Sequence, residues 1–332
     1  MERQLAPPCR SHLAATDARL SLANMTWIGM LATIAAIAVI SAEIGARLAG
    51  LHQPLIYERT SYGYRVVPGQ NARLLNRTAS YDAYGLRSSP FSGQPADGQL
   101  RILCIGDSIT NGGLRIDQSE TWPILLQEAL KSRGVDAQVL NASAGGWALE
   151  NEAGWFTEHG TLHSQIVVFE VGTHDLWQPR SSEETVGTHP AFPDRPPRLA
   201  LQAAFVRYIK PRLSRMIVAD PGTTGGEPTM ADMEARLGVL RSMVAQARSQ
   251  GATPMILHVE QPGEHEISTP AVIEAKQTLQ RWVAAEGIVY VNSKDAVEKA
   301  GGTTLFFDPY HPNVAGNRVI AALVAEKLPR TR

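Results

Sequence analysis

The chain has 332 residues, of which 44% are hydrophobic, and a formal net charge of -1 at pH 7. This length suffices for one large α/β domain with an appendage or for two modest domains. A nearly neutral chain lacks both the basic field that attracts nucleic acid and the acidic excess of disordered proteins, so we expect a small-molecule partner and no nucleic acid. The two cysteines, Cys9 and Cys104, make no disulfide framework, and we interpret Cys104 as a small buried hydrophobe.

A polar tail, residues 1–19, precedes an uncharged segment of 23 residues from Leu20 to Ala42. As a helix this segment would extend about 34 Å, which matches a bilayer core. No small-residue cleavage site follows cleanly, so we predict an uncleaved transmembrane helix or signal anchor over residues 20–42, with a cleaved signal peptide or a buried core helix as alternatives. The flanking arginines are balanced on the two sides and do not set an orientation.

Residues 43–98 are rich in Tyr, Arg, Ser, Gly and Pro and hold short alternating runs between turn signals. We predict a linker with a small β appendage. Its five tyrosines, from Tyr57 to Tyr84, are more typical of packing onto a domain than of ligand binding.

From residue 99 to 332 short apolar runs alternate with helix-length amphipathic stretches, which predicts an α/β domain with a doubly wound parallel sheet of five strands in the order 2-1-3-4-5. A proline-rich segment from Gln178 to Pro228, with a helix-like stretch over Arg198–Met216, interrupts this pattern as either a lid or an exposed insertion. The predicted strands cover residues 101–107, 137–143, 165–172, 253–260 and 287–292, and the predicted helices cover 121–133, 149–159, 230–250 and 271–286.

Polar, glycine-bearing clusters follow the first three predicted strands: "GDSIT", "NASAGGW" and "GTHDLW". In a doubly wound sheet ligands bind outside the carboxyl ends of the strands. Near the C-terminus, "FFDPYHPN" places Asp308 three residues before His311, and a serine nucleophile such as Ser108 needs a base of this kind, oriented by a carboxylate. Asp308 and His311 as a helix cap and a loop histidine are the alternative.

Ser108 does not lie in a Gly-x-Ser-x-Gly elbow, because position 110 is Thr. The chain instead resembles the SGNH (GDSL-type) hydrolase family, as a membrane-anchored bacterial-type member, over roughly residues 100 to 328. The resemblance implies a flavodoxin-like α/β fold with Ser108 as nucleophile and Asp308 and His311 as the other triad members. It also implies an oxyanion hole formed by the backbone N–H of Ser108 and of Gly146, with Gly145 as a near rival.

The third family block departs from its pattern, because Gly172-Thr173-His174-Asp175 carries His174 where the family has asparagine. His174 is either a pH-sensitive donor to the oxyanion hole or points elsewhere and leaves only backbone donors there. The loss of one such donor typically costs roughly 10²–10³ in kcat, which slows an esterase without abolishing its activity.

The leading functional hypothesis is a serine esterase that removes small acyl groups, acetyl above all, from a carbohydrate or another small molecule. Lipid and thioester hydrolysis are compatible with the family; an O-acyltransferase using the same triad and a non-catalytic glycan-binding envelope module with a decayed site are the alternatives. We expect a membrane-anchored protein with its catalytic domain on the extracytoplasmic, periplasmic side, or a secreted protein if the segment is cleaved.

No metal or organic cofactor is needed for this chemistry. The stretch "HVEQPGEHE", residues 258–266, lacks a recognised metal-ligand spacing and is interpreted as a solvated loop. Trp147 and Trp177, which follow two of the blocks, are weak candidates for contacts with a sugar or an acyl group.

Overall fold

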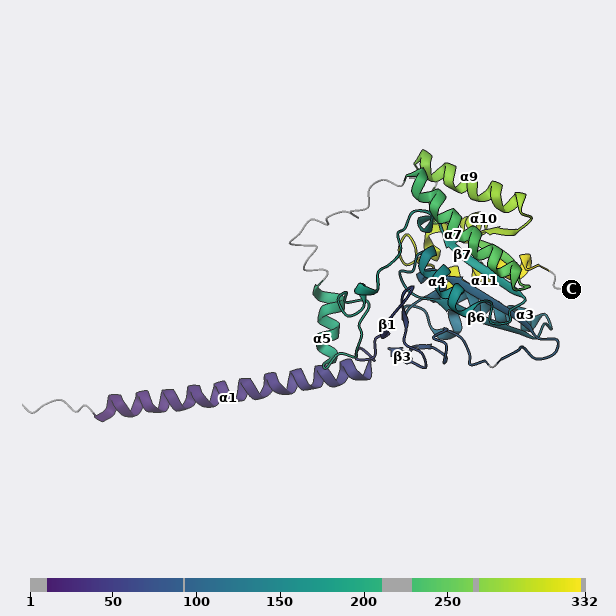
Figure 1. Ribbon diagram of the computed structural model, residues 1–332. Coiled ribbons are helices and arrows are strands. Elements are labelled where there is room, and N and C mark those ends of the chain that lie inside the picture. Colours follow the sequence, from purple (N-terminus) through teal and green to yellow (C-terminus); the bar gives the residue numbers. More distant parts are fainter. Residues whose placement is uncertain (1–10, 92, 211–228, 265–268, 330–332) are drawn as a thin grey trace, which may run out of the picture.

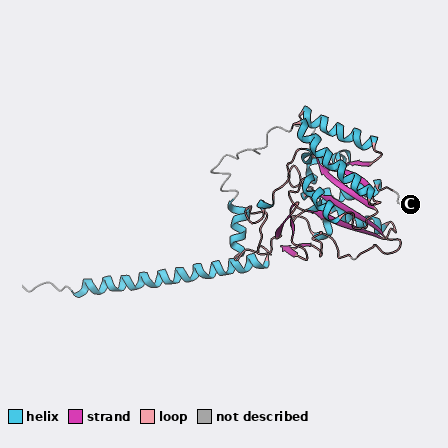
Figure 2. Cartoon of the chain, in the orientation of Figure 1, coloured by secondary structure: helices cyan, strands magenta, loops and turns pink. Residues whose placement is uncertain are grey.

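A five-stranded parallel sheet lies at the centre of the computed structural model, which describes residues 11–91, 93–210, 229–264 and 269–329. Its strand order is β6-β5-β7-β8-β9, and every neighbouring pair is parallel (Figure 2). This confirms the predicted order 2-1-3-4-5. The strands are β5 (Leu100–Gly106), β6 (Ala137–Ser143), β7 (Ile166–Gly172), β8 (Thr253–Val259) and β9 (Val289–Asn292).

Helices cover both faces of the sheet (Figure 1), which is why the central strands are apolar without interruption. Ile102 and Cys104 of β5 belong to the core on the side of α3 and α11, whereas Leu103 and Ile105 belong to the core on the side of α4, α7 and α9. Burial raises the pKa of the Cys104 thiol, so Cys104 packs as predicted. The covering helices are α3 (Trp122–Ser132), α4 (Leu149–His159), α7 (Met230–Ser249), α9 (Pro270–Ala285) and α11 (Val314–Lys327).

Two antiparallel hairpins form the appendage ahead of the sheet. Four of its tyrosines are buried and join the core on the α4 side, and only Tyr84 is exposed, so they pack the appendage onto the domain as expected. The hairpin strands are β1 (Tyr57–Thr60), β2 (Gly63–Val66), β3 (Asn71–Leu74) and β4 (Arg77–Ser80).

A buried arginine joins the appendage to the loop that follows Ser108. The guanidinium of Arg87 donates hydrogen bonds to the backbone carbonyls of Asn111, of Gly113 at 2.6 Å and of Ile116 at 2.8 Å. Carbonyl oxygens thus satisfy a cation that is wholly removed from solvent. This clamp holds the loop against the appendage.

The N-terminal helix α1 (Ser11–Leu48) projects from the domain as a single rod (Figure 1). Its part from Trp27 to Leu48 has a mean hydropathy of 2.0, and by length and composition it can cross a membrane. Ala46, near its C-terminal end, is the buried residue of this part. The helix includes residues 20–42 and continues to Leu48, where the first turns of the appendage begin.

The segment after β7 holds the irregular part of the domain. Its helical stretch is present up to Lys210, as one α-helical turn followed by a π-helical turn, and residues 211–228 lie outside the described part. The shorter elements are α2 (Ser108–Asn111), η1 (Gln118–Glu120), η2 (Thr173–Leu176), η3 (Glu183–Thr185), α5 (Ala200–Ala204), η4 (Phe205–Ile209), α10 (Lys294–Ala300) and η5 (Gly302–Leu305).

Candidate active site

The turn between β5 and α2 presents Ser108 at the carboxyl end of the sheet. Asp107 caps α2, because its Oδ1 accepts a hydrogen bond from the backbone N–H of Ile109 at 2.7 Å. A Cβ on Gly106 would lie 2.6 Å from Glu170 Oε2, so only glycine fits at the last position of the strand. These contacts fix Ser108 as the first residue of α2, next to the sheet edge.

Ser108, His311 and Asp308 form one hydrogen-bonded line. His311 Nε2 lies 2.9 Å from Ser108 Oγ, and His311 Nδ1 lies 2.7 Å from Asp308 Oδ1. Asp308 Oδ1 also accepts hydrogen bonds from the backbone N–H of Tyr310 and of His311, which fix the tight turn between the two residues. The carboxylate holds the proton on Nδ1 and leaves Nε2 to accept the proton of the serine.

The second oxygen of Asp308 pairs with Arg115, whose Nη1 lies 2.6 Å from Oδ2. Partial burial alone would raise the pKa of Asp308, but the hydrogen bonds from Arg115 and His311 lower it to about 2. The Arg115 guanidinium also covers the ring of Phe307, with 4.6 Å between its Cζ and the ring centroid. Asp308 is therefore a carboxylate at any pH near neutrality, with both oxygens occupied.

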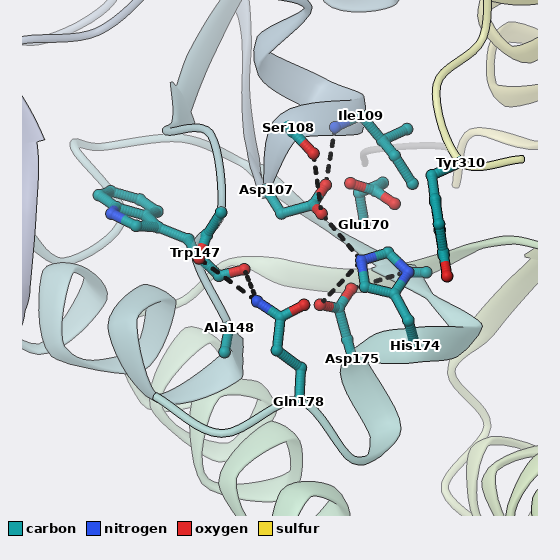
Figure 3. Close-up of polar contacts among 12 residues, drawn as sticks. Asp107, Ser108, Ile109, Trp147, Ala148, Glu170, His174, Asp175, Gln178 and Tyr310 are labelled. Atoms are coloured by element: carbon teal, nitrogen blue, oxygen red, sulfur yellow. Dashed lines mark hydrogen bonds and ion pairs between the residues drawn. The ribbon is translucent and has the colours of Figure 1, made fainter. Parts of the chain in front are cut away.

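The loop after β6 carries Gly146, the second predicted oxyanion donor. Gly146 has φ +74°, a left-handed conformation that favours glycine, and a Cβ there would lie 2.9 Å from the Tyr64 hydroxyl. Tyr64 donates to the Gly145 carbonyl at 2.9 Å. Gln178 donates to the Gly146 carbonyl at 3.3 Å and to the Trp147 carbonyl at 3.1 Å, and its contacts with this loop are drawn in Figure 3. Within the described residues no hydrogen bond uses the backbone N–H of Ser108 or of Gly146, so both donors are free.

His174 lies on the opposite side of Asp107 from Ser108 (Figure 3). Its Nε2 is 3.1 Å from Asp107 Oδ2 and 3.6 Å from Asp175 Oδ1, and Ser108 Oγ is 3.3 Å from the same Asp107 oxygen. Burial alone would lower the pKa of His174, but Asp175 and Asp107 outweigh it and raise the pKa to about 9. At neutral pH His174 is thus an imidazolium whose Nε2 donates to Asp107, the second of the two orientations that the sequence left open.

Three further carboxyl groups lie buried behind this ion pair. Burial raises the pKa of Asp175 to about 7 and raises those of Glu152 and Glu170 well above their ordinary value. Glu170 accepts a hydrogen bond from the Thr110 hydroxyl at 2.9 Å. Burial therefore favours the protonated form of both Glu152 and Glu170.

A metal ion has one candidate location among the described residues. The ligand atoms of Asp107, His174 and Asp175 lie within 4.8 Å of one another. The same atoms form the ion pair between the imidazolium and the two carboxyl groups.

Trp147 does not contribute to a substrate surface, which corrects its interpretation as a substrate contact. Its side chain is 1% exposed, and its indole N–H donates to the Tyr64 carbonyl at 2.7 Å. It is a core residue that fixes β2 against the loop after β6. Trp177 is half-buried against the same core, and its proposed contact with substrate stays a prediction.

The interpretation of residues 258–266 as a solvated loop is wrong for His258, Glu260 and Glu264. His258 is buried in β8 and bonded to Thr173 and Tyr290, and burial lowers its pKa to about 4. Glu260 and Glu264 are also buried, because Lys276 of α9 pairs with both. Residues 265 and 266 lie outside the described part.

Three site residues were missed by sequence reasoning. Tyr310 lies inside the "DPYH" motif, is 43% exposed and meets the His174 ring edge-on at 5.2 Å. Tyr64 was noted only as one of five packing tyrosines. Arg115 is 193 positions from its partner Asp308, and no local sequence pattern predicts such a pair.

Comparisons with known proteins identify the family of the chain. A model of the GDSL-like lipase/acylhydrolase family matches residues 104–319, more than half of the chain, and the chain therefore belongs to this family. It is an ester-hydrolysing enzyme. A search among curated proteins finds no significant match.

Several solved structures are similar to the chain at low identity. A member of the lipolytic G-D-S-L family from Veillonella parvula is 16% identical with a TM-score of 0.44, and the match covers 70% of this chain and 100% of that one. LAE5, an alpha/beta hydrolase enzyme from the metagenome of Lake Arreo, Spain, is 18% identical with a TM-score of 0.45, covering 71% and 98%. The psychrotrophic esterase EstA from a Pseudoalteromonas species is 15% identical with a TM-score of 0.40, covering 69% and 96%.

Proposed function

We propose that the protein is a membrane-anchored serine esterase that removes small acyl groups, acetyl above all, from a carbohydrate at the extracytoplasmic face of a membrane. One observation carries the catalytic part: His311 bridges Ser108 Oγ at 2.9 Å and Asp308 at 2.7 Å. The family supports ester hydrolysis, and the catalytic roles of these residues, the substrate and the location are the proposal.

The chemistry follows from the geometry. Ser108 Oγ attacks the ester carbonyl carbon while His311 Nε2 takes the serine proton, and the free N–H groups of Ser108 and Gly146 stabilise the oxyanion. The carbon–oxygen bond to the alcohol then breaks, and the leaving alcohol takes the proton from His311. Water, deprotonated by His311, attacks the acyl-enzyme and releases the acid and the serine.

His174 acts in this scheme through its charge. As an imidazolium it pairs with Asp107, whose Oδ2 lies 3.3 Å from Ser108 Oγ. Without that cation the Asp107 carboxylate would stand unpaired beside the reaction centre and repel the developing oxyanion. The asparagine of the family pattern is thus replaced by a positively charged neighbour of the nucleophile.

The residues around the site support a substrate with a small acyl group and a sugar ring as its alcohol. Beside the oxyanion loop, a Cβ on Gly146 would lie 2.9 Å from Tyr64 Oη and 3.3 Å from Phe192 Cζ, which leaves little room there. Next to His311 the Tyr310 ring is 43% exposed, and a sugar ring stacks readily on an aromatic face of this kind.

Contacts between α1 and the folded domain support an anchor that is not removed. Glu43 and Arg47, near its C-terminal end, both bind the segment after β7. Processing that removed the whole helix would strip these contacts from the domain, so we propose an anchor that stays attached.

A fluorophosphonate probe tests the enzyme against a non-catalytic binder. We expect covalent labelling of Ser108 in the folded protein, no labelling after Ser108→Ala, and strongly slowed labelling after His311→Ala. A folded wild-type protein that stays unlabelled would favour a glycan-binding module.

Turnover assays define the substrate. Acetylated sugars are compared with p-nitrophenyl esters of rising chain length, and we expect the rate to fall beyond the shortest chains. The products are then analysed with and without a sugar acceptor: free acetate in both cases supports a hydrolase, and acyl transfer to the acceptor would make the protein an O-acyltransferase.

A further inference from the structure

Specific hydrogen bonds join α1 to the α/β domain. Both carboxylate oxygens of Glu43 on α1 accept hydrogen bonds at 2.9 Å, from the backbone N–H of Ala200 and of Leu201 at the start of α5. Leu199, the residue that caps α5, supplies no side-chain hydrogen bond, so Glu43 replaces the missing cap. Arg47 pairs with Glu43 at 2.7 Å and donates to the Arg198 carbonyl at 2.8 Å.

This joint sets the height of α5 along α1. Glu43 is the first charged residue after the uncharged run of residues 20–42, so in a bilayer it lies where the hydrocarbon ends. From Glu43 to Leu48 the helix rises about 7.5 Å, similar to the roughly 5–8 Å of one headgroup layer. Figure 1 shows that α5 leaves α1 sideways, and α5 and η4 therefore run along the membrane surface.

Exposed apolar side chains gather around the same joint. Outside α1, the four most exposed large hydrophobic side chains of the described residues are Leu75 at 55%, Leu199 at 52%, Phe205 at 48% and Ile209 at 47%. Leu75 is tied to the end of α1, because its N–H donates to the Ala49 carbonyl at 2.6 Å. Together with Leu48, which is 73% exposed, we name these five residues the apolar collar.

Cations accompany the collar. The stretch from Asp194 to Lys210 carries four cations and one acid, and all five side chains are exposed. The cations also line a cleft of about 730 Å³ between the end of α1, the β3–β4 hairpin and this stretch, together with apolar side chains such as Leu51, Leu74 and Leu114. The cations are Arg195, Arg198, Arg207 and Lys210.

We infer that the collar and these cations bind the anionic lipid surface of the membrane that α1 enters, with the collar at the boundary of headgroups and acyl chains. Apolar side chains with adjacent cations are the pattern of interfacial helices, and a positive surface is attracted to anionic headgroups. The inference rests on the proposed anchor. It adds that the domain is held on the lipid in one fixed orientation.

Spin labels on the full chain in lipid nanodiscs test this inference. The background is Cys9→Ser, with the buried Cys104 retained. Single labels are introduced by Ile209→Cys and Leu75→Cys in the collar and by Ile34→Cys in α1. Ser132→Cys labels the exposed C-terminal end of α3. Accessibility to oxygen is compared with accessibility to a water-soluble nickel complex. We expect residue 34 deep in the bilayer, residues 75 and 209 at its boundary and residue 132 in water.

The outcomes separate the inference from the anchor. Residue 34 in the bilayer with residues 75 and 209 in water would overturn the inference and leave the anchor intact. Residue 34 in water would overturn the anchor itself, and with it the inference.

The lipid charge is tested in the same discs. Replacing about a quarter of the phosphatidylcholine by anionic phosphatidylglycerol should move the label at residue 209 deeper into the bilayer. Replacing the four cations by glutamine should abolish that difference. Equal depth of the parent protein in both lipids would overturn the role of the cations.

Discussion

The two sides of Ser108 are built in opposite ways. On one side the His311 and Asp308 side chains are 34% and 32% exposed, and each nitrogen and oxygen of the dyad has a partner. On the other side the His174 side chain is 14% exposed and Asp175 is wholly buried. Polar atoms of His174, Asp175 and Glu152 there have no hydrogen-bond partner among the described residues. The exposed side can be altered with little effect on folding, whereas the buried side couples charge to stability.

Ser108→Ala should have the largest effect on activity. We expect kcat to fall by about 10⁴-fold or more, because the nucleophile is lost, while the free energy of unfolding changes by no more than about 0.5 kcal/mol. Ester turnover and urea unfolding measure the two quantities. A variant that retains most of its turnover would remove the triad from the mechanism.

His174→Ala should affect stability more than any change on the triad side. It leaves the buried Asp107 carboxylate without its cation, and we expect a loss of about 3 kcal/mol in the free energy of unfolding. His174→Asn restores the residue of the family pattern but also removes the charge beside Asp107, so we expect both variants to lower kcat. Equal kcat in all three proteins would exclude His174 from catalysis.

The ion pair between His174 and Asp107 should make the free energy of unfolding depend on pH. The pKa of His174 is raised from its ordinary 6.5 to about 9, so its contribution is complete below pH 6.5 and is lost as the pH rises through 9. Between pH 6 and pH 10 the wild type should lose up to about 3 kcal/mol more than His174→Asn. Parallel stability curves for the two proteins would show that His174 is not charged in the fold.

Arg115→Gln should have a smaller effect, on the exposed side. Removing this cation raises the pKa of the Asp308 carboxyl, which is about 2 in the wild type, toward its ordinary value. The acid limb of kcat/KM should therefore move to higher pH, by less than about one unit because the pair is half-exposed. Arg318→Gln, at another exposed arginine paired only at 4.0 Å, is the matched control and should leave the profile in place.

Dialysis against EDTA should have no effect on turnover, because the proposed mechanism uses no metal. A loss of activity that added Zn²⁺ restores would contradict this expectation. It would place an ion between Asp107, His174 and Asp175, the one group of the described residues that is arranged to hold it.

The sheet, its order and the convergence of Ser108 with His311 could be predicted because each depends on a local pattern. Apolar runs fix the strands, and short motifs at their carboxyl ends fix the loops. The Arg115–Asp308 pair could not be predicted, because its members come from loops 193 residues apart. Glu260 and Glu264 looked solvated because nothing near them in the sequence shows that Lys276 enters from α9 to neutralise both.

The Arg87 clamp and the Tyr64 hydroxyl bear on where the catalytic unit begins. The residue composition places a border near residue 99, yet the carbonyls after Asn111 and the carbonyl of Gly145 both take their donors from upstream of it. A truncated version that starts at that border would keep Ser108, Asp308 and His311. It would lose the hydrogen bonds that Arg87 and Tyr64 donate to the loops after Asn111 and after β6. We therefore expect that moving this enzyme to another membrane anchor would require the hairpins to move with it.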